Sequence, residues 1–194
     1  MTVAGLLLAA GAGTRFGRPK ALVRFEGELL VERGVRLLAE GGCDPVLVVL
    51  GAQADVVQEA AALADVVVAT DWKRGMGASL RAGLHALQHR PVDACVVALA
   101  DQPGIGAEAV KRLLAAHAAG AVAAVATYDG AARNPVLLSK PTWNDVAALA
   151  VGDAGARSWL RAHPDQVTAV ACDGTGTPLD IDTPDDLARL EALA

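Results

Sequence analysis

Near its start the chain reads VAGLLLAAGAGTRFGRPK, residues 3–20. Residues 3–10 carry no charge and are almost all apolar, which is typical of a strand that is buried on both faces of a parallel sheet. The glycines that follow let the backbone turn sharply and bring several N–H groups close to an anion. Arg15 and Lys20 add positive charge, and an arginine can pair with two phosphate oxygens. The stretch therefore predicts a buried strand that leads into a phosphate-binding loop.

Two better-known phosphate loops do not match this stretch. A Walker loop has Gly-Lys followed by Ser or Thr, whereas the sequence after Gly17 is Arg-Pro-Lys. A dinucleotide-binding loop has Gly-x-Gly-x-x-Gly at the start of a helix, and the spacing of Gly11, Gly13 and Gly17 is one residue too long for it. A flexible glycine loop with solvated basic residues is the structural alternative. The offsets of Arg15 and Lys20 from the glycines favour phosphate binding.

Short apolar runs alternate with helix-like segments along most of the chain. We expect strands over residues 3–10, 45–50, 66–69, 93–100, 121–126, 133–138 and 166–172. We expect helices over residues 29–40, 55–64, 78–88, 108–118, 142–149, 154–161 and 185–193. This alternation predicts a three-layer α/β fold around a mostly parallel sheet. Ligands of such folds bind beyond the carboxyl ends of the strands, so the loops after residues 10 and 100 are the first candidates for a site.

The composition limits the class of protein. The 194 residues fit a single domain, 1–194, and hydrophobic residues make up 53% but aromatic residues only 3%, so Ala, Val and Leu must build the core. A net charge of −5 argues against binding nucleic acid through a basic face. No apolar run reaches the roughly 18 residues of a membrane span, and the start lacks the charged region of a signal peptide. We expect a cytoplasmic protein that binds neither nucleic acid nor membranes.

The side chains that most often bind zinc or act as nucleophiles form no familiar pattern. Cys43, Cys95 and Cys172 are odd in number and far apart, which suggests neither a disulfide framework nor a zinc site. His85 and His89 lie one helical turn apart, but no third ligand accompanies them. The serines lack the Gly-x-Ser-x-Gly context of a hydrolase.

Carboxylates offer a candidate metal site instead. Asp101 follows the apolar run that ends at residue 100, which suits a Mg²⁺ ligand, although an Asp here also suits a simple turn. Asp180 and Asp182 flank Ile181, and in an extended segment both carboxylates lie on one face. The sequence from Thr183 onwards is typical of a helix start, which explains the later acids but leaves Asp180 and Asp182 unexplained.

Five segments of the chain resemble the nucleotidyltransferases that attach a nucleotide to the molybdenum cofactor, within the MobA-like NTP transferase family. In family order they are residues 8–20, 75–83, 100–103, 152–157 and 180–186. The resemblance is greatest to the cytidylyltransferases. Guanylyltransferases typically have Leu-Ala-Gly-Gly where this chain has Leu-Ala-Ala-Gly, and Cys-Asp-x-Pro where it has Ala-Asp-Gln-Pro. The resemblance implies a three-layer nucleotide-binding fold.

The resemblance also implies an activity, namely transfer of CMP from CTP to the terminal phosphate of molybdopterin that carries molybdenum, with release of pyrophosphate. It implies Mg²⁺ as the cofactor, held by Asp101 and Asp182, and catalytic roles for Arg15, Lys20 and Asp101. The implied nucleotide-binding residues are Leu8, Ala9, Ala10, Gly11, Ala12, Gly13, Arg15, Lys20, Gly75, Ser79 and Asp101. The implied substrate-binding residues are Gln102, Asn134, Asp153 and Arg157. The expected partner is a molybdenum hydroxylase or its maturation factor.

Several alternatives stay open. Asp153 suits the cap of a following helix as well as a substrate contact. Around Asn134 the chain departs from the family pattern Arg-Gly-His/Asn-Pro-Val, because Ala132 replaces the Arg and Arg133 replaces the Gly. The glycine loop does not distinguish bases, so GTP could be the donor and another small phosphate the acceptor. A nucleotide-binding regulatory module without chemistry is the alternative from a different class.

Overall fold

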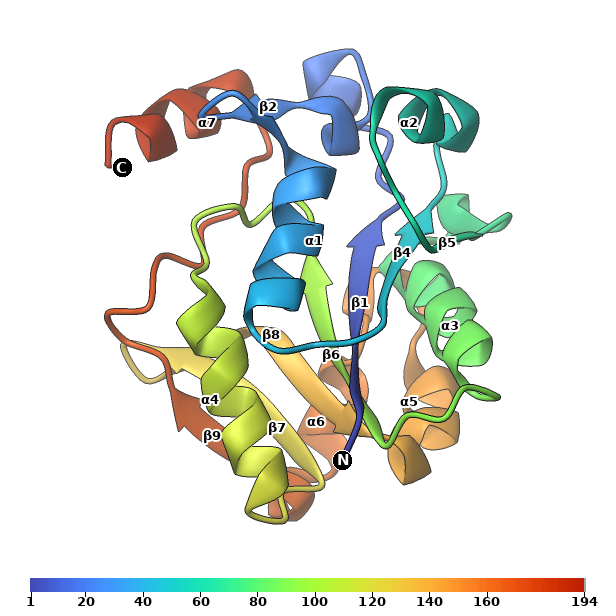
Figure 1. Ribbon diagram of the computed structural model, residues 1–194, viewed down its shortest axis with the longest axis vertical. Coiled ribbons are helices and arrows are strands. Elements are labelled where there is room, and N and C mark those ends of the chain that lie inside the picture. Colours follow the sequence, from blue (N-terminus) through green and yellow to red (C-terminus); the bar gives the residue numbers. More distant parts are fainter. Residues whose placement is uncertain (194) are drawn as a thin grey trace.

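The computed structural model describes residues 1–193, and a seven-stranded sheet forms its centre (Figure 1). The strands lie in the order β5 (Val66–Val68), β4 (Val46–Leu50), β1 (Val3–Ala9), β6 (Ala94–Leu99), β8 (Ala131–Ser139), β7 (Ala123–Tyr128) and β9 (Val167–Ala171). Strand β1 pairs in parallel with β4 and β6, as do β4 with β5 and β7 with β9. Strand β8 alone runs antiparallel to its neighbours. The predicted α/β fold with a mostly parallel sheet is confirmed.

The antiparallel strand β8 arises from a hairpin that the sequence analysis missed. Asp129 and Gly130 join β7 to β8, and both have positive φ angles, 50° and 74°. An Asp-Gly pair between two apolar runs is a strong signal for such a two-residue turn. The pairing extends both strands toward the turn, so β7 covers 123–128 rather than 121–126, and β8 covers 131–139 rather than 133–138.

Helices cover both faces of the sheet, which gives the expected three layers. On one face lie α1 (Leu30–Glu40), α2 (Ala54–Ala60) and α4 (Ala107–Ala118), and on the other lie α3 (Met76–Leu87), α5 (Trp143–Leu149) and α6 (Arg157–Ala162). Strand β1 shows why its sequence is apolar throughout: Leu7 packs into the first layer and Leu6 into the second, and both are fully buried. A strand with helices on both sides has no face left for polar residues.

The helix expected over 154–161 begins later than predicted. The chain forms a short 3₁₀ turn, Gly152–Ala154, and α6 starts only at Arg157. Gly155 separates the two, with a φ of 52° that a right-handed helix does not contain. Similarly, the helix expected over 55–64 ends at Ala60.

Outside the two faces of the sheet, a small hydrophobic cluster holds the segment around Ile181 and Leu190 against residues that follow the glycine loop. The hairpin β2 (Arg24–Phe25) and β3 (Glu28–Leu29), which the sequence analysis did not predict, lies beside α7 (Pro184–Glu191) (Figure 1). Val23, Phe25, Leu30, Ile181 and Leu190 bury one another in this cluster. The residues that precede α7 are thereby fixed near residues 23–30, just after the glycine loop. None of the helices in residues 1–193 is long and apolar enough to cross a membrane.

Candidate active site at the carboxyl ends of β1 and β6

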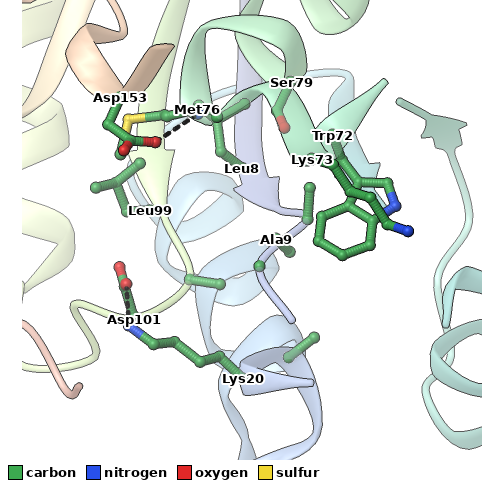
Figure 2. A pocket seen from close by; sticks show the side chains of 15 residues that line it. Leu8, Ala9, Lys20, Trp72, Lys73, Met76, Ser79, Leu99, Asp101 and Asp153 are labelled. Carbon is green, nitrogen blue, oxygen red and sulfur yellow. Dashed lines mark hydrogen bonds and ion pairs between the residues drawn. The ribbon is translucent and has the colours of Figure 1, made fainter. Parts of the chain in front are cut away.

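Two adjacent parallel strands bring the glycine loop and Asp101 to one edge of the sheet. The pairing of β1 with β6 continues to the last residue of β6, so the loops that follow start side by side. The first loop turns back on itself at Gly13, where φ is 58° and a Cβ would lie 2.0 Å from the carbonyl oxygen of Arg18. A short 3₁₀ helix then begins at Lys20, whose side chain extends to Asp101 (Figure 2). The loop therefore needs a glycine at position 13 to place Lys20.

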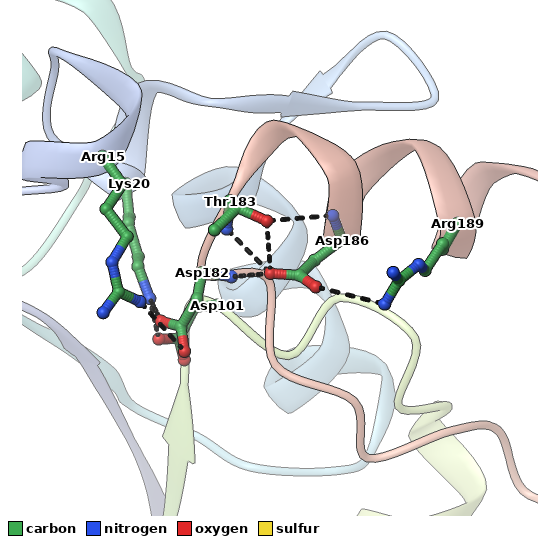
Figure 3. A network of polar contacts seen from close by, with 7 residues as sticks. All are labelled: Arg15, Lys20, Asp101, Asp182, Thr183, Asp186 and Arg189. Atoms are coloured by element: carbon green, nitrogen blue, oxygen red, sulfur yellow. Dashed lines mark hydrogen bonds and ion pairs between the residues drawn. The ribbon is translucent and has the colours of Figure 1, made fainter.

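The Lys20 ammonium lies between two carboxylates that are far apart in sequence (Figure 3). Its Nζ atom is 2.8 Å from Asp101 Oδ2 and 2.6 Å from Asp182 Oδ1. Burial acts to lower the pKa of Lys20, but the charge of Asp101 and the hydrogen bonds to both acids outweigh it and raise that pKa above its usual value. Arg15 lies at the edge of the group, 3.8 Å from Asp182 Oδ2, with 68% of its side chain exposed. The structure thus brings together the four residues predicted for catalysis and metal binding.

The segment before α7 has the two-sided arrangement expected from its sequence. Ile181 is fully buried and its backbone N–H donates to the carbonyl oxygen of Asp101 at 2.8 Å. On the opposite face, Asp182 reaches Lys20, while Asp180 accepts a hydrogen bond from Gln102 Nε2 at 2.9 Å. Burial and the charge of Asp101 raise the pKa of the Asp180 carboxyl, which the bond from Gln102 partly offsets. The two neighbouring acids therefore have different partners.

The helix start after this segment also has the expected form. Thr183 and Asp186 form a reciprocal capping box, in which each side chain accepts a hydrogen bond from the other residue's backbone N–H (Figure 3). This cap fixes the point at which the chain leaves the extended segment. Asp182 takes no part in the box through its side chain, which leaves its carboxylate free to face Lys20.

A cavity of about 310 Å³ opens beside Lys20 and contains most of the predicted nucleotide-binding residues (Figure 2). The predicted residues on its wall are Leu8, Ala9, Ala10, Gly11, Lys20, Gly75, Ser79 and Asp101. Ala12, Gly13 and Arg15 lie outside the wall. The wall also contains residues that the sequence analysis missed, among them Trp72, Lys73, Met76 and Leu99. Trp72 could have been suspected, because it is one of only three tryptophans and precedes the Gly75 segment by three residues.

A second cavity, of about 740 Å³, lies on the other side of Asp101. All four predicted substrate-binding residues line it, namely Gln102, Asn134, Asp153 and Arg157. The amide nitrogen of Gln102 is held by Asp180 and by the carbonyl oxygen of Pro178, whereas its buried Oε1 has no partner among residues 1–193. Asp101 and Asp153 belong to the walls of both cavities. The site therefore consists of two chambers that meet at Asp101.

Asp153 caps a helix, but not the helix that follows it in sequence. Its Oδ1 atom accepts a hydrogen bond from the backbone N–H of Met76, the first residue of α3, at 3.3 Å (Figure 2). The expectation that it caps the next helix is wrong, because that helix starts only at residue 157. The turn that carries Asp153 is thus fastened to the start of α3, between the two cavities.

The two carboxylates near Lys20 fit a magnesium ion that takes most of its other ligands from substrate and water. Among residues 1–193, no three His, Cys, Asp or Glu side chains gather into a metal-binding group. Two carboxylates do converge on one cation, the Lys20 ammonium. Mg²⁺ is usually held by one or two carboxylates, with phosphate oxygens and waters completing its shell. The three cysteines are buried, and burial raises the pKa of each thiol, that of Cys43 to about 12, so they are not thiolates at neutral pH.

Comparison with known proteins places this chain among nucleotidyltransferases. Residues 5–167 match the MobA-like NTP transferase domain. The chain is 40% identical to the nicotine blue oxidoreductase of Paenarthrobacter nicotinovorans, over 97% of this chain and 96% of that protein. It is 31% identical to the molybdenum cofactor guanylyltransferase of Rhodobacter capsulatus, over 98% and 96% of the two chains.

Solved structures of one mycobacterial protein resemble this chain over its whole length. The crystal structure of Rv0371c from Mycobacterium tuberculosis H37Rv has a TM-score of 0.88 and 31% identity, and covers 99% of this chain and 98% of its own. The crystal structure of the same protein in complex with manganese has a TM-score of 0.85 and 29% identity, and covers 100% of both chains. The likeness therefore includes the segment that carries Asp180 and Asp182.

Proposed function

Because the chain belongs to the MobA-like NTP transferase family, we propose that this nucleotidyltransferase moves CMP from CTP to the terminal phosphate of molybdenum-bearing molybdopterin. The observation that carries the proposal is the meeting of two cavities at Asp101, beside the Lys20 ammonium. The smaller chamber, with the glycine loop on its wall, is the proposed CTP site. The larger chamber is the proposed acceptor site, in which Gln102, Asn134 and Arg157 contact the pterin substrate. The expected recipient of the product is a molybdenum hydroxylase or its maturation factor.

The proposed reaction needs no general base. The acceptor is a phosphate monoester with a second pKa of about 6, so its terminal oxygen is already ionised at pH 7. This oxygen attacks the α-phosphorus of CTP, the bond from that phosphorus to the oxygen bridging it to the β-phosphorus breaks, and pyrophosphate leaves with the electron pair. The protein has to align the two phosphates and neutralise their charge. Lys20, Arg15 and the backbone of the glycine loop supply that charge and alignment.

Asp101 and Asp182 are the proposed ligands of a Mg²⁺ ion that arrives with the triphosphate. Their convergence on the Lys20 ammonium supports this, since the same two oxygens already face one cation. The manganese complex of the mycobacterial relative supports use of a divalent ion. When bound, Mg²⁺ would neutralise phosphate charge at the reacting centre. For Asp153 we propose a positioning role: its hydrogen bond from the Met76 backbone N–H fastens the turn between the two cavities to the start of α3.

The base preference of the small chamber is the first testable prediction. Ala10 and Trp72 pack against Gly51, where a Cβ would lie 2.8 Å and 2.7 Å from their Cβ atoms, so this wall has little room to yield. We expect CTP to have a kcat/KM roughly 10–200-fold higher than GTP, the usual range for exclusion by one methyl-sized group. Ala10→Gly should raise the GTP value more than the CTP value. Steady-state kinetics with both nucleotides measures this, and a higher kcat/KM for GTP in the unaltered protein would contradict the assignment of CTP.

Gly75→Ala tests the junction between the two chambers. The φ of Gly75 is 100°, and an added Cβ would lie 2.6 Å from both Asp153 Oδ1 and the Gly152 carbonyl oxygen. We expect a stability loss of roughly 1–3 kcal/mol from backbone strain, with weaker CTP binding because Asp153 must move. Gly130→Ala is the matched control: its φ is also positive, but a Cβ there meets nothing within 4 Å. Urea unfolding and CTP calorimetry should show two destabilised variants, of which only Gly75→Ala binds CTP less well. Equal CTP affinity in the two variants would refute the role of the junction.

The overall proposal is tested by pyrophosphate release with each of the four nucleoside triphosphates, in the presence and absence of molybdenum-bearing molybdopterin. We expect release that requires both CTP and the acceptor. Release with GTP alone among the nucleotides would support the guanylyltransferase alternative. Nucleotide binding without release in any combination would support a regulatory module.

The oxidoreductase named among the relatives provides a second candidate function, because its identity of 40% is substantial. Such a reaction needs an electron carrier. In this chain the cysteines are buried and the glycine spacing differs from that of dinucleotide-binding loops. Reduction of nicotine blue by NADH or NADPH, followed by absorbance, tests this candidate directly. A turnover faster than nucleotidyl transfer would make it the main activity.

A further inference from the structure

Lys20 occupies the position in which a metal ion would contact Asp101 and Asp182. One ammonium is hydrogen-bonded to an oxygen of each acid, at 2.8 Å and 2.6 Å, and only 19% of the Lys20 side chain is exposed (Figure 3). A Mg²⁺ ion would need the same carboxylates at about 2.0–2.1 Å. The two cations would therefore lie within a few ångströms of each other, where like charges repel strongly in a partly buried site. The two cations therefore compete for these acids.

We propose that Lys20 is the resident cation of the nucleotide-free site and excludes a free divalent ion from it. The triphosphate offers the ammonium another anionic partner, so nucleotide binding releases Asp101 and Asp182 for the metal. Metal and nucleotide then enter together. Asp101 and Asp182 are paired with the Lys20 ammonium before nucleotide binds and with the metal ion afterwards. This inference rests on the proposed function for its second half, whereas exclusion of free metal by Lys20 is a property of the empty site.

The surrounding charges determine what removal of Lys20 would do. Asp180 lies close enough to Asp101 and Asp182 for their charges to act on it. Without Lys20, Arg15 would be the remaining cation among residues 1–193 within 4 Å of these acids, and it is largely exposed and lies 3.8 Å from Asp182. Such a cluster attracts a divalent cation more strongly than the intact site. A lysine that served only to bind phosphate would have no such effect on metal affinity.

The test is Mn²⁺ binding to the nucleotide-free protein, measured by the electron paramagnetic resonance signal of free Mn²⁺. We expect Lys20→Met to bind Mn²⁺ at least about fivefold more tightly than the unaltered protein, while Lys20→Arg, which keeps the charge, gains little. Lys73→Met is the matched control. Lys73 lines the same cavity, but its ammonium lies 5.7 Å from the centre of the Trp72 ring and makes no ion pair among the described residues. Its loss should leave Mn²⁺ affinity unchanged.

A double variant locates the ion. Adding Asp182→Asn to Lys20→Met should abolish the gain, which shows that the tighter ion sits between these acids. Melting curves establish that each variant is folded, and Lys20→Gln replaces Lys20→Met if that variant unfolds. Equal or weaker Mn²⁺ binding in the folded, uncharged Lys20 variant would overturn the inference. The measurement contains no nucleotide, so a failure of the proposed transfer reaction would leave it intact and would be recognised separately.

Discussion

Asp101→Asn and Asp182→Asn should each reduce nucleotidyl transfer by roughly a hundredfold or more, the usual effect of removing one preorganised electrostatic group at a reacting centre. Both substitutions keep the shape of the side chain and remove the charge that the proposed metal site requires. The fold should survive, because Ile181 and the capping box hold the segment in place independently of Asp182. The measurement is single-turnover transfer with saturating CTP and Mg²⁺.

Asp180→Asn is the control within the same segment. Asp180 accepts its hydrogen bond from Gln102, and an Asn side chain retains an oxygen for that bond, so this variant should keep most of its activity. Asp101 and Asp182 would repel each other without a cation between them, but each forms an ion pair with Lys20 that an Asn side chain would weaken. The Asn variants at 101 and 182 should therefore be slightly less stable than the unaltered protein. For Asp182, whose side chain is 53% exposed, the loss should be about 1 kcal/mol or less. If Asp180→Asn loses activity and Asp182→Asn does not, the choice between the two acids is wrong.

Lys20→Ala should weaken CTP binding by roughly 1.5–3 kcal/mol, the contribution of a charge-assisted hydrogen bond, and should slow transfer at saturating CTP as well. The reason is that Lys20 lies on the wall of the small chamber beside Asp101, where the reacting phosphates are proposed to meet. Calorimetry with CTP and Mg²⁺ gives the affinity. Arg18→Ala is the matched control, since Arg18 belongs to the same loop but is exposed. Unchanged CTP affinity and turnover in Lys20→Ala, or equal losses in both variants, would contradict the role of Lys20.

The sequence was most informative where one physical requirement dominated. Residues 3–10 and 94–100 are apolar because helices cover both faces of the sheet, and this made the parallel strands and the position of Asp101 predictable. Ile181 between two acids likewise indicated an extended segment with one buried face. The resemblance to a family then supplied pairings between distant residues, such as Asp101 with Asp182, which no local pattern contains.

The missed features depend on contacts between segments. Asp153 caps α3 rather than the next helix because Gly155 interrupts the chain after it, and a cap supplied from 77 residues away leaves no trace in local sequence. Trp72 reaches the small chamber because Gly51 and Ala10 leave room for it. The β7–β8 hairpin is different, since its Asp-Gly turn is a local signal that predicts it. The position of Lys20 between two acids reflects electrostatics that appear only once the fold has brought them together.

The central claim is that this site transfers the α-phosphate of CTP, with its nucleoside, to a phosphorylated acceptor. CTP labelled with ³²P at the α-position, incubated with Mg²⁺ and molybdenum-bearing molybdopterin, tests it most directly. We expect the label to appear in a product containing both CMP and the pterin, in amounts equal to the pyrophosphate released. With γ-labelled CTP, we expect the label in pyrophosphate. Label that stays in CTP or appears only as free CMP would contradict the proposed transfer.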